Sequence, residues 1–309
     1  MKPGLPFSSI ITEMGFLVGT SGYDYPEWIG AERFYPPGLE GRRRDFLTYY
    51  ASQFPLVELN FTHYGHTSPQ QLEGMLARVR PEAELFLLEG AFRPRADFAF
   101  SLKTYRELTH DIKPDFRTVA AKFQQDIAPL RDAGKLAAVV FQFPPSFRPG
   151  AETAKYLAQT AELFAEYPAV FEFRHQDWFN DEAAEGLRRM NVPLCWVDGP
   201  ASSRLPRLFF PVTGGFAYAR FHGRNEEHWW ARAKEDGRGE GSDAHLRGDA
   251  AKSARYDYSY TQPELVELAE AITKTKADDT RILFNNHVAA KAPANARNLA
   301  EILADLKLG

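Results

Sequence analysis

The amino-acid sequence predicts an α/β fold, a single (β/α)8 TIM-like barrel, from three observations. Eight short runs of β-branched, aromatic and other apolar residues recur along the chain, and segments with helical periodicity lie between them. Strands that alternate with helices need parallel crossover connections. Eight such units close into a barrel, typically of about 250 residues, and the chain has 309. A doubly wound open sheet is the main alternative.

The strands are expected where β-forming residues cluster, and the helices where apolar residues recur every three to four positions. The expected strands are Phe16–Gly22, Leu56–Asn60, Phe98–Thr104, Ala137–Phe143, Ala169–Arg174, Leu194–Asp198, Ala217–Gly223 and Arg281–Asn286. The expected helices are Arg43–Phe54, Ser68–Val79, Phe116–Ala133, Thr153–Ala165, Asp181–Met190, Pro263–Thr273 and Pro293–Leu306. Proline near the start of three of these helices supports their placement, since the first helical turn tolerates a residue without an N–H.

The whole chain, residues 1–309, is expected to form one barrel domain with an insertion at residues 225–256. The segment Asn225–Tyr256 between the seventh and eighth strands is charged and contains glycine, unlike the rest of the chain. We expect it to form a loop or lid, and its Trp229-Trp230 pair suggests a lid edge or a partner contact. The link Gly199–Gly215 is rich in proline and glycine and is expected to lack a regular helix.

Composition and charge exclude several classes of protein. The 24 Phe, 13 Tyr and 5 Trp supply ample core material, which excludes a disordered chain. The net charge of -4 argues against nucleic-acid and membrane partners. One cysteine excludes an internal disulfide and a cysteine-rich zinc site. The absence of a leader and of a long apolar run predicts a cytoplasmic protein.

Polar residues alternate with apolar ones along most of the strands. The apolar face must pack against the helices, so the polar face is expected to point into the barrel. These side chains lie near the carboxyl ends of the strands, where barrel enzymes hold their chemistry. The expected inward set is Glu58, Asn60, Lys103, Gln142, Glu172, Arg174, Arg220 and His222, joined by Asp198, which shares a face with Trp196. Cys195 is then expected to face the helices.

The formal charges of this inward set cancel. Three acids (Glu58, Glu172 and Asp198) stand against three bases (Lys103, Arg174 and Arg220). One interpretation is a satisfied ion-pair network that fills the mouth of the barrel. The other is a site pre-organised for a polar or anionic ligand, which we favour because buried ion pairs stabilise a fold poorly.

The combined motifs resemble the YecE-like family, the domain of unknown function numbered 72, along nearly the whole chain. The motifs are Val18–Gly22, Trp28, Phe34–Pro36, Val57–Asn60, Thr62, Tyr64, Lys103, Thr109-His110, Gln142–Phe147, Glu172–His175, Trp178, Asp198, Arg220–Arg224, Phe284–Asn286 and Asn295-Ala296. The resemblance implies a TIM-like barrel and leaves the reaction open. Phe61 and His63 replace the serine and phenylalanine usual for the family, and His287–Ala290 lacks the usual glycine. The insertion is also longer than usual.

Two chemistries would use the inward carboxylates. Glu58 and Glu172 are candidates for acid and base, as in sugar hydrolysis, with a sugar stacked on aromatic residues near strand ends: Trp28, Tyr35, Tyr64 and Trp178. The alternative is that both glutamates pair with arginines, which would keep them ionised. Acids together with His222 would suit a divalent metal, but the neighbouring arginines would repel a cation.

Two further chemistries would use the inward cations. Arg174 and Arg220 offer planar forks for carboxylate or phosphate. The loops after strands seven and eight often hold phosphate in barrels, and here they supply Gly223, Arg224 and Asn286. Lys103 would form a Schiff base only with a lowered pKa. The nearby glutamates are expected to raise that pKa through ion pairing.

The sequence therefore predicts an enzyme of uncertain class that acts on a small polar, anionic or sugar-like metabolite at the mouth of the barrel. The catalytic candidates are Glu58, Glu172 and His222. The ligand-binding candidates are Lys103, Gln142, Arg174, Asp198, Arg220, Arg224, Asn285, Asn286, Trp28, Tyr64 and Trp178. No metal and no cofactor are implied, since phosphate-cradling glycine motifs are absent. The alternative is a non-catalytic barrel that binds a small ligand or a partner. His63 and His66 are expected in a loop at the rim or surface.

Overall fold

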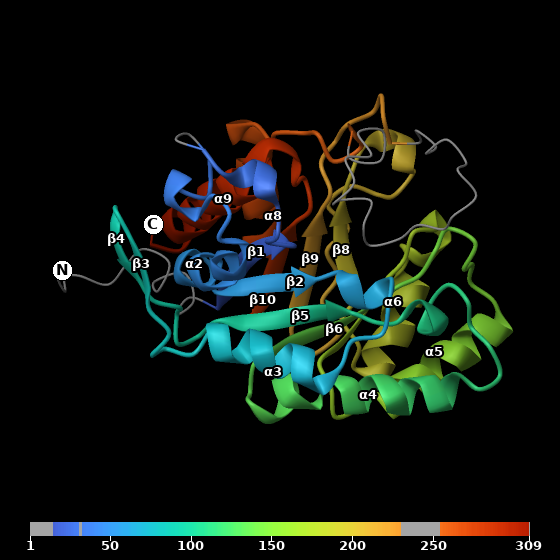
Figure 1. Ribbon diagram of the computed structural model, residues 1–309. Helices are drawn as coiled ribbons and strands as arrows, with labels where there is room; N and C mark the ends of the chain where they lie inside the picture. Colours follow the sequence, from blue (N-terminus) through green and yellow to red (C-terminus); the bar gives the residue numbers. More distant parts are fainter. Residues whose placement is uncertain (1–14, 31–32, 230–253, 309) are drawn as a thin grey trace.

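The expected α/β barrel is confirmed in the computed structural model, which describes residues 15–30, 33–229 and 254–308. Eight parallel strands form one sheet in the order β7-β6-β5-β2-β1-β10-β9-β8. A bridge between Phe171 and Leu194 joins the two edges, so the barrel is nearly closed (Figure 1). The strands are β1 (Phe16–Ser21), β2 (Leu56–Leu59), β5 (Ala99–Lys103), β6 (Leu136–Gln142), β7 (Ala169–Glu172), β8 (Cys195–Asp198), β9 (Ala217–Phe221) and β10 (Thr280–Phe284).

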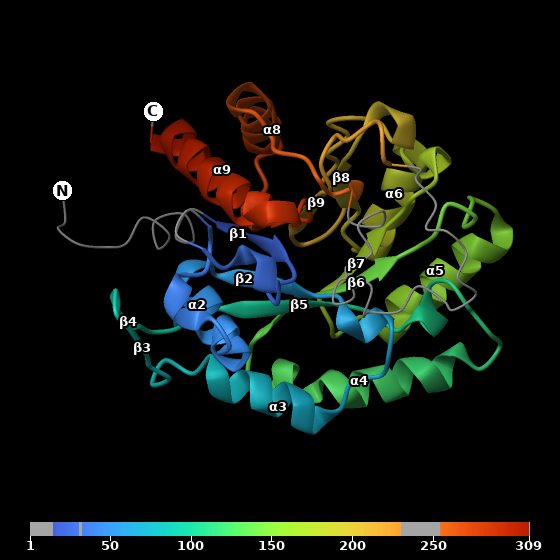
Figure 2. The same ribbon diagram turned by 45° about the horizontal axis from the view of Figure 1, so that its top comes forward.

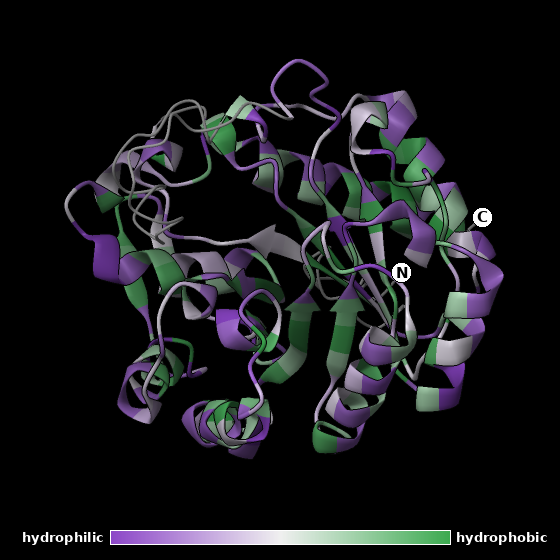
Figure 3. Ribbon diagram, turned by 90° about the vertical axis from the view of Figure 1, so that its right-hand side faces the viewer, coloured by the Kyte–Doolittle hydropathy of each residue, from purple (hydrophilic) through white to green (hydrophobic). Residues whose placement is uncertain are grey.

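Helices surround the strands, and their outer faces are largely hydrophilic (Figures 2 and 3). Each expected helix is present within a few residues of its expected bounds. They are α2 (Phe46–Gln53), α3 (Pro69–Arg78), α4 (Phe116–Asp132), α5 (Ala151–Leu163), α6 (Asp181–Met190), α8 (Gln262–Lys274) and α9 (Lys291–Leu308). Side-chain hydrogen bonds cap the N-termini of two of these helices. The Ser68 hydroxyl accepts the Gln71 N–H ahead of α3, and Thr261 and Glu264 form a capping box on α8.

A small antiparallel hairpin was not expected from the sequence. It consists of β3 (Leu85–Leu87) and β4 (Gly90–Phe92), at the left of Figure 1. Each strand has three residues, too few for a period of two to stand out. The hairpin lies far from the carboxyl ends of the barrel strands, so it does not contribute to the mouth.

Two apolar clusters show which way the strand residues point. The larger one lies between sheet and helices and includes Val57 and Phe171, as expected. The smaller one fills the barrel interior and includes Leu56, Val140 and Tyr218. Strand side chains alternate between these two clusters, so the polar residues at the carboxyl ends of most strands do face inward.

The side chains of β8 point the opposite way from the expectation. Cys195 and Val197 belong to the interior cluster, whereas Trp196 packs outside on Phe210 with ring centroids 4.9 Å apart. Asp198 shares the face of Trp196, as expected, but that face is the helix side. The small Cys195 and Val197 fit the barrel interior, and the indole of Trp196 packs in the outer layer.

The link at residues 199–215 contains one 3-10 turn, Ala201–Ser203, and no α-helix, as expected. Residues 230–253, which carry most of the expected lid, lie outside the described residues. In the part of the chain that the structure describes, no helix combines the length and apolar character needed to cross a bilayer.

Candidate functional site

One arginine lies between two carboxylates at the carboxyl end of the barrel. Arg220 of β9 donates from Nη2 to Glu58 Oε1 at 2.7 Å and from Nη1 to Glu172 Oε2 at 2.5 Å. The two glutamates are 0% exposed and Arg220 is 2% exposed. The closure of the barrel brings these residues of β2, β7 and β9 together, although their strands are not neighbours. The inward direction expected for all three is confirmed.

Further polar groups surround this centre. Glu172 Oε1 forms an ion pair with Arg174 at 2.5 Å, and the Tyr218 hydroxyl donates to Glu58 Oε2 at 2.9 Å. Arg220 also donates to Gln142 Oε1 at 3.1 Å. Both glutamates are thereby held by hydrogen bonds and ion pairs within the protein, which offsets the cost of burying their charge.

We refer to the buried polar side chains around Arg220 as the array. His222 connects the array to Asn285, which follows the last strand. Its Nε2 lies 2.9 Å from Arg174 Nη2, and its Nδ1 lies 3.0 Å from the side-chain amide of Asn285. Burial and then the Arg174 charge lower the pKa of His222 to about 3. The imidazole is therefore neutral at physiological pH and acts as a hydrogen-bonding group.

The electrostatics of the array keep Glu172 ionised. Burial alone would raise its pKa, but the charges of Arg174 and Arg220 lower it well below the ordinary value. An ionised carboxylate can accept a proton or attract a cation, but it cannot donate a proton. Because the Arg220 guanidinium lies between Glu58 and Glu172, it occupies the position that a glycosidic bond would take between an acid and a base.

Asp198 and Arg224 lie on the helix side of β8 and not in the inward set. The Arg224 guanidinium donates to both oxygens of Asp198, with Nε 2.9 Å from Oδ2, and the Tyr260 hydroxyl donates to Oδ2 at 2.7 Å. Glu264 of α8 binds the opposite side of Arg224 at 3.1 Å. This cluster joins the barrel to α8, so the expected inward position of Asp198 is wrong.

Polar groups in the loops after β9 and β10 form hydrogen bonds within the protein. The Gly223 N–H donates to the Tyr260 hydroxyl at 3.0 Å, and Asn286 Nδ2 donates to Asn295 Oδ1 at 2.8 Å. Gly223 has a φ of +89°, and a Cβ there would lie 2.7 Å from Cβ of Tyr258. These groups hold the segment that leads into α8 and are not turned toward a phosphate. Asn285, one residue earlier, does face the array.

Lys103 differs from the ion-paired lysine that the sequence suggested. The arginines and Tyr218 occupy the carboxylates, and Lys103 Nζ forms no hydrogen bond or ion pair with any described residue. The residue is 6% exposed. Burial and then Arg220 lower its pKa to about 7, although Glu172 and Glu58 act in the opposite direction. Lys103 is therefore poised between its charged and neutral forms near neutral pH.

Most of the aromatic candidates are packing residues. Trp28 and Tyr35 are 0% exposed and stack among other rings within the segment between β1 and α2. The Trp178 ring stacks on Phe173 with centroids 4.3 Å apart, and its Nε1 donates to the Phe147 carbonyl. Tyr64 is half-buried and lines a cavity. These contacts leave Tyr64 as the aromatic candidate that a ligand can reach.

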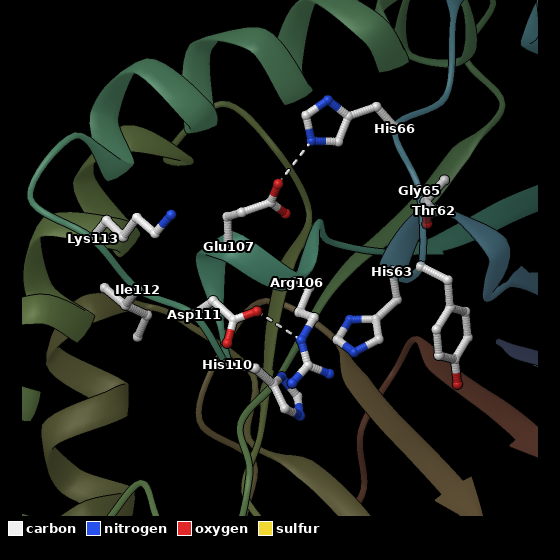
Figure 4. Close-up of a pocket in the computed structure, with 11 residues that line it drawn as sticks. Thr62, His63, Gly65, His66, Arg106, Glu107, His110, Asp111, Ile112 and Lys113 are labelled. Atoms are coloured by element: carbon white, nitrogen blue, oxygen red, sulfur yellow. Dashed lines mark hydrogen bonds and ion pairs between the residues drawn. The ribbon is translucent and has the colours of Figure 1, made fainter. Parts of the chain in front are cut away.

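A cavity of about 610 Å³ lies beyond the ends of β2 and β5 (Figure 4). In it His66 Nε2 pairs with Glu107 at 3.0 Å, and Arg106 pairs with Asp111 at 2.7 Å. The lining residues are Thr62, His63, Tyr64, Gly65, His66, Arg106, Glu107, His110, Asp111, Ile112 and Lys113. Sequence reasoning placed His63 and His66 near the rim but missed this cavity. The Thr109-His110 motif was the available signal, since His63 and His110 have ring centroids 4.8 Å apart.

His63 is buried at the inner end of this cavity. Burial and then the charge of Lys103 lower its pKa to about 2.

A second cavity of about 590 Å³ lies on the other side of the mouth, and Arg174 is among its lining residues. Among the described residues, no group of three or more histidine, cysteine or acidic side chains is placed to hold a metal ion.

Comparison with known proteins places this barrel in a family. The family described as "Protein of unknown function DUF72" matches residues 17–308. The UPF0759 protein YunF of Bacillus subtilis is 26% identical over 289 residues, which cover 89% of this chain and 92% of YunF.

Two solved structures share the fold. A DUF72 family protein from Thermotoga maritima is 30% identical with a TM-score of 0.71, and the match covers 93% of this chain and 98% of that one. A DUF72 family protein from Enterococcus faecalis is 23% identical with a TM-score of 0.69, over 93% of this chain and 95% of that one. The second likeness concerns the fold alone.

Proposed function

Because the chain belongs to the DUF72 family of proteins of unknown function, we propose its function from the site itself. The carboxyl end of the barrel binds a small anionic metabolite and carries out acid–base chemistry on it. The protein is on this proposal an enzyme, and the anion binds beside Lys103 and Arg174.

The charge of the inward set carries this proposal. With Asp198 on the helix side, Glu58 and Glu172 balance Arg220 and Arg174, and Lys103 remains as a buried cation that has no carboxylate partner among the described residues. A buried charge is costly unless it is paired. The protonated lysine either loses its proton or gains an anion from outside, and a bound anion would stabilise the protonated form.

The array supplies distinct groups for the proposed chemistry. Lys103, with a pKa of about 7, can give or take a proton at neutral pH. Ionised Glu172 fixes Arg174, whose side chain is 14% exposed and therefore reachable from the mouth. The neutral His222 lies 2.9 Å from the same Nη2 of Arg174 that pairs with Glu172, and Asn285 holds the other ring nitrogen of His222. Pre-organised groups of this kind favour a charged transition state.

The test combines ligand binding with a generic assay for proton transfer. Thermal unfolding is followed with pyruvate, lactate, inorganic phosphate and uncharged glycerol. A ligand at about 100 times its Kd adds about 2.7 kcal/mol of stability, so the anions should raise the Tm and glycerol should not. The shift should vanish in Lys103→Met and persist in Lys155→Met, a matched control at an exposed lysine. If no anion raises the Tm, the proposal fails.

A non-catalytic binding barrel is the second candidate, and one observation favours it. The carboxylates of Glu58 and Glu172 are both paired with arginines of the protein, as in an ion-pair network with a structural role. Solvent deuterium exchange into a bound anion, followed by NMR, separates the two. An enzyme of this kind exchanges the protons adjacent to the pyruvate carbonyl faster than Glu172→Gln does. A binding protein leaves the exchange at the rate in buffer.

A further inference from the structure

We propose that Lys103 Nζ is a nucleophile that forms an imine with the carbonyl carbon of a small aldehyde or keto acid bound at the mouth of the barrel. This inference rests on the proposed function and names its substrate class. The ligand carries a carbonyl group next to, or a few bonds from, a carboxylate or another anionic group.

The surroundings of the amine are the first reason. Lys103 is the last residue of β5 and follows the inward-facing Ser101 by two positions, so its side chain enters the barrel from the same face. Both glutamates within electrostatic reach are held by arginines, whose planar forks match a carboxylate better than an ammonium does. The amine nitrogen therefore keeps its lone pair available whenever it is neutral.

The charges around Lys103 set how often it is neutral. Burial acts first and Arg220 second to lower its pKa to about 7, Arg174 acts in the same direction, and the two glutamates oppose them. About half of the molecules then carry a neutral amine near pH 7, compared with about one in 2,500 for a lysine at its ordinary pKa. A desolvated lysine beside another cation is the usual form of an imine-forming lysine.

A cavity lies next to two residues that neighbour Lys103. The Thr62 hydroxyl donates to the Lys103 carbonyl at 2.5 Å, and His63 lies close enough for the Lys103 charge to lower its pKa. Both residues line the cavity of about 610 Å³. On this proposal a carbonyl compound enters from this cavity to reach Nζ, and Arg174, which lines the second cavity, holds its anionic group.

The covalent step balances without any redox partner. The Nζ lone pair attacks the carbonyl carbon, a C–N bond forms, and the π bond of the carbonyl breaks to give an alkoxide that takes a proton. The proton lost from Nζ balances this one, which gives a neutral carbinolamine. Loss of the hydroxyl group as water, with a second proton from nitrogen, forms the C=N bond. The net change is amine plus carbonyl to imine plus water.

The experiment traps the imine by reduction. The full-length protein is incubated with pyruvate or glyoxylate and sodium borohydride, and the adducts are located by peptide mass spectrometry. We expect the adduct on Lys103 in at least tenfold excess over exposed Lys155, and competition by lactate, which has the carboxylate but no carbonyl. Lys103→Met should carry no adduct at this position, and Lys155→Met should be modified like the wild type. Lys103→Arg keeps a cation at the site and serves where the Met variant does not fold.

The possible outcomes either support or overturn the imine at Lys103. Preferential, lactate-sensitive labelling of Lys103 supports the imine. Absent or indiscriminate labelling, together with Lys103-dependent Tm shifts from both pyruvate and lactate, overturns the imine and leaves the anion site standing. Absent labelling without any Tm shift overturns both the imine and the proposed function.

Discussion

The position of Arg220 between two buried carboxylates makes its removal the sharpest test of the site. In Arg220→Met the side chain keeps much of its apolar length but loses the guanidinium. Glu58 then retains the Tyr218 hydroxyl, and Glu172 retains Arg174. Removing one partner of a buried ion pair destabilises a protein by about 3–5 kcal/mol, because a buried charge is left without compensation.

This loss converts into a measurable change of Tm. Unfolding entropy is about 2.1 cal/mol/K per residue, which for 309 residues gives about 0.65 kcal/mol/K. The Tm should therefore fall by roughly 5–8 °C. Arg189→Met is the matched control, because that side chain is 77% exposed in its pair with Glu185 and should change stability by no more than about 0.5 kcal/mol.

The pH dependence of Arg220→Met separates lost charge pairing from lost packing. In the wild type, the lowered pKa of Glu172 gives stability that is present above the unfolded pKa of about 4.3 and is lost as the pH falls toward the lower, folded pKa. Without Arg220 the Glu172 carboxylate binds a proton more readily. The stability gap between wild type and variant should therefore narrow between pH 7 and pH 5. A gap below about 1 kcal/mol, or one that is constant with pH, would refute the reasoning.

Three further predictions concern Lys103, Asp198 and Cys195. Lys103→Met should raise the free energy of unfolding at pH 7 by on the order of 4 kcal/mol, because the folded pKa of about 7 lies below the unfolded value of about 10.4. The gain should disappear toward pH 10, and denaturant titrations at both pH values check it. Asp198→Asn weakens the contact to Arg224 and should destabilise the protein by about 1–3 kcal/mol. Its Kd for pyruvate should stay within about twofold of wild type, since Asp198 lies outside the barrel interior; a larger change would place it in the site. Cys195 is buried and its pKa is raised by burial, so a thiol-reactive disulfide should label it only in denaturant. Fast labelling of the native protein would show that the barrel interior opens.

The fold was predictable because strand alternation and helix periodicity are local signals. The strand Ala169–Arg174 shows why, since its phenylalanines and charged residues separate cleanly onto two faces. Alternation says which residues share a face, but not which face turns inward. In β8 both faces carry apolar residues, so the sequence did not decide between Asp198 and Cys195. The direction depends on neighbours in the folded barrel, such as Phe210, on which the Trp196 ring packs.

The composition of the inward set was largely predictable, but its pairing was not. Six expected members meet in the structure: Glu58, Gln142, Glu172, Arg174, Arg220 and His222. Which cation reaches which carboxylate depends on the positions of strands that are not neighbours in the sheet. The cavity beside His63 and His110 was missed for a similar reason, since it forms between two 3-10 turns distant in sequence.

The array has a stronger rationale as a device for controlling Lys103 than as a stabiliser of the barrel. Apolar residues of similar volume would stabilise the interior as well as buried ion pairs do. Glu58 and Glu172 without Arg220 would hold Lys103 protonated, because both carboxylates raise its pKa. Arg220 neutralises them and adds a positive charge of its own. The pKa of the Lys103 amine is therefore kept at about 7. On this argument Arg220→Met abolishes the borohydride trapping at Lys103 even under conditions where the variant remains folded, whereas a merely structural array would leave the trapping of the folded fraction unchanged.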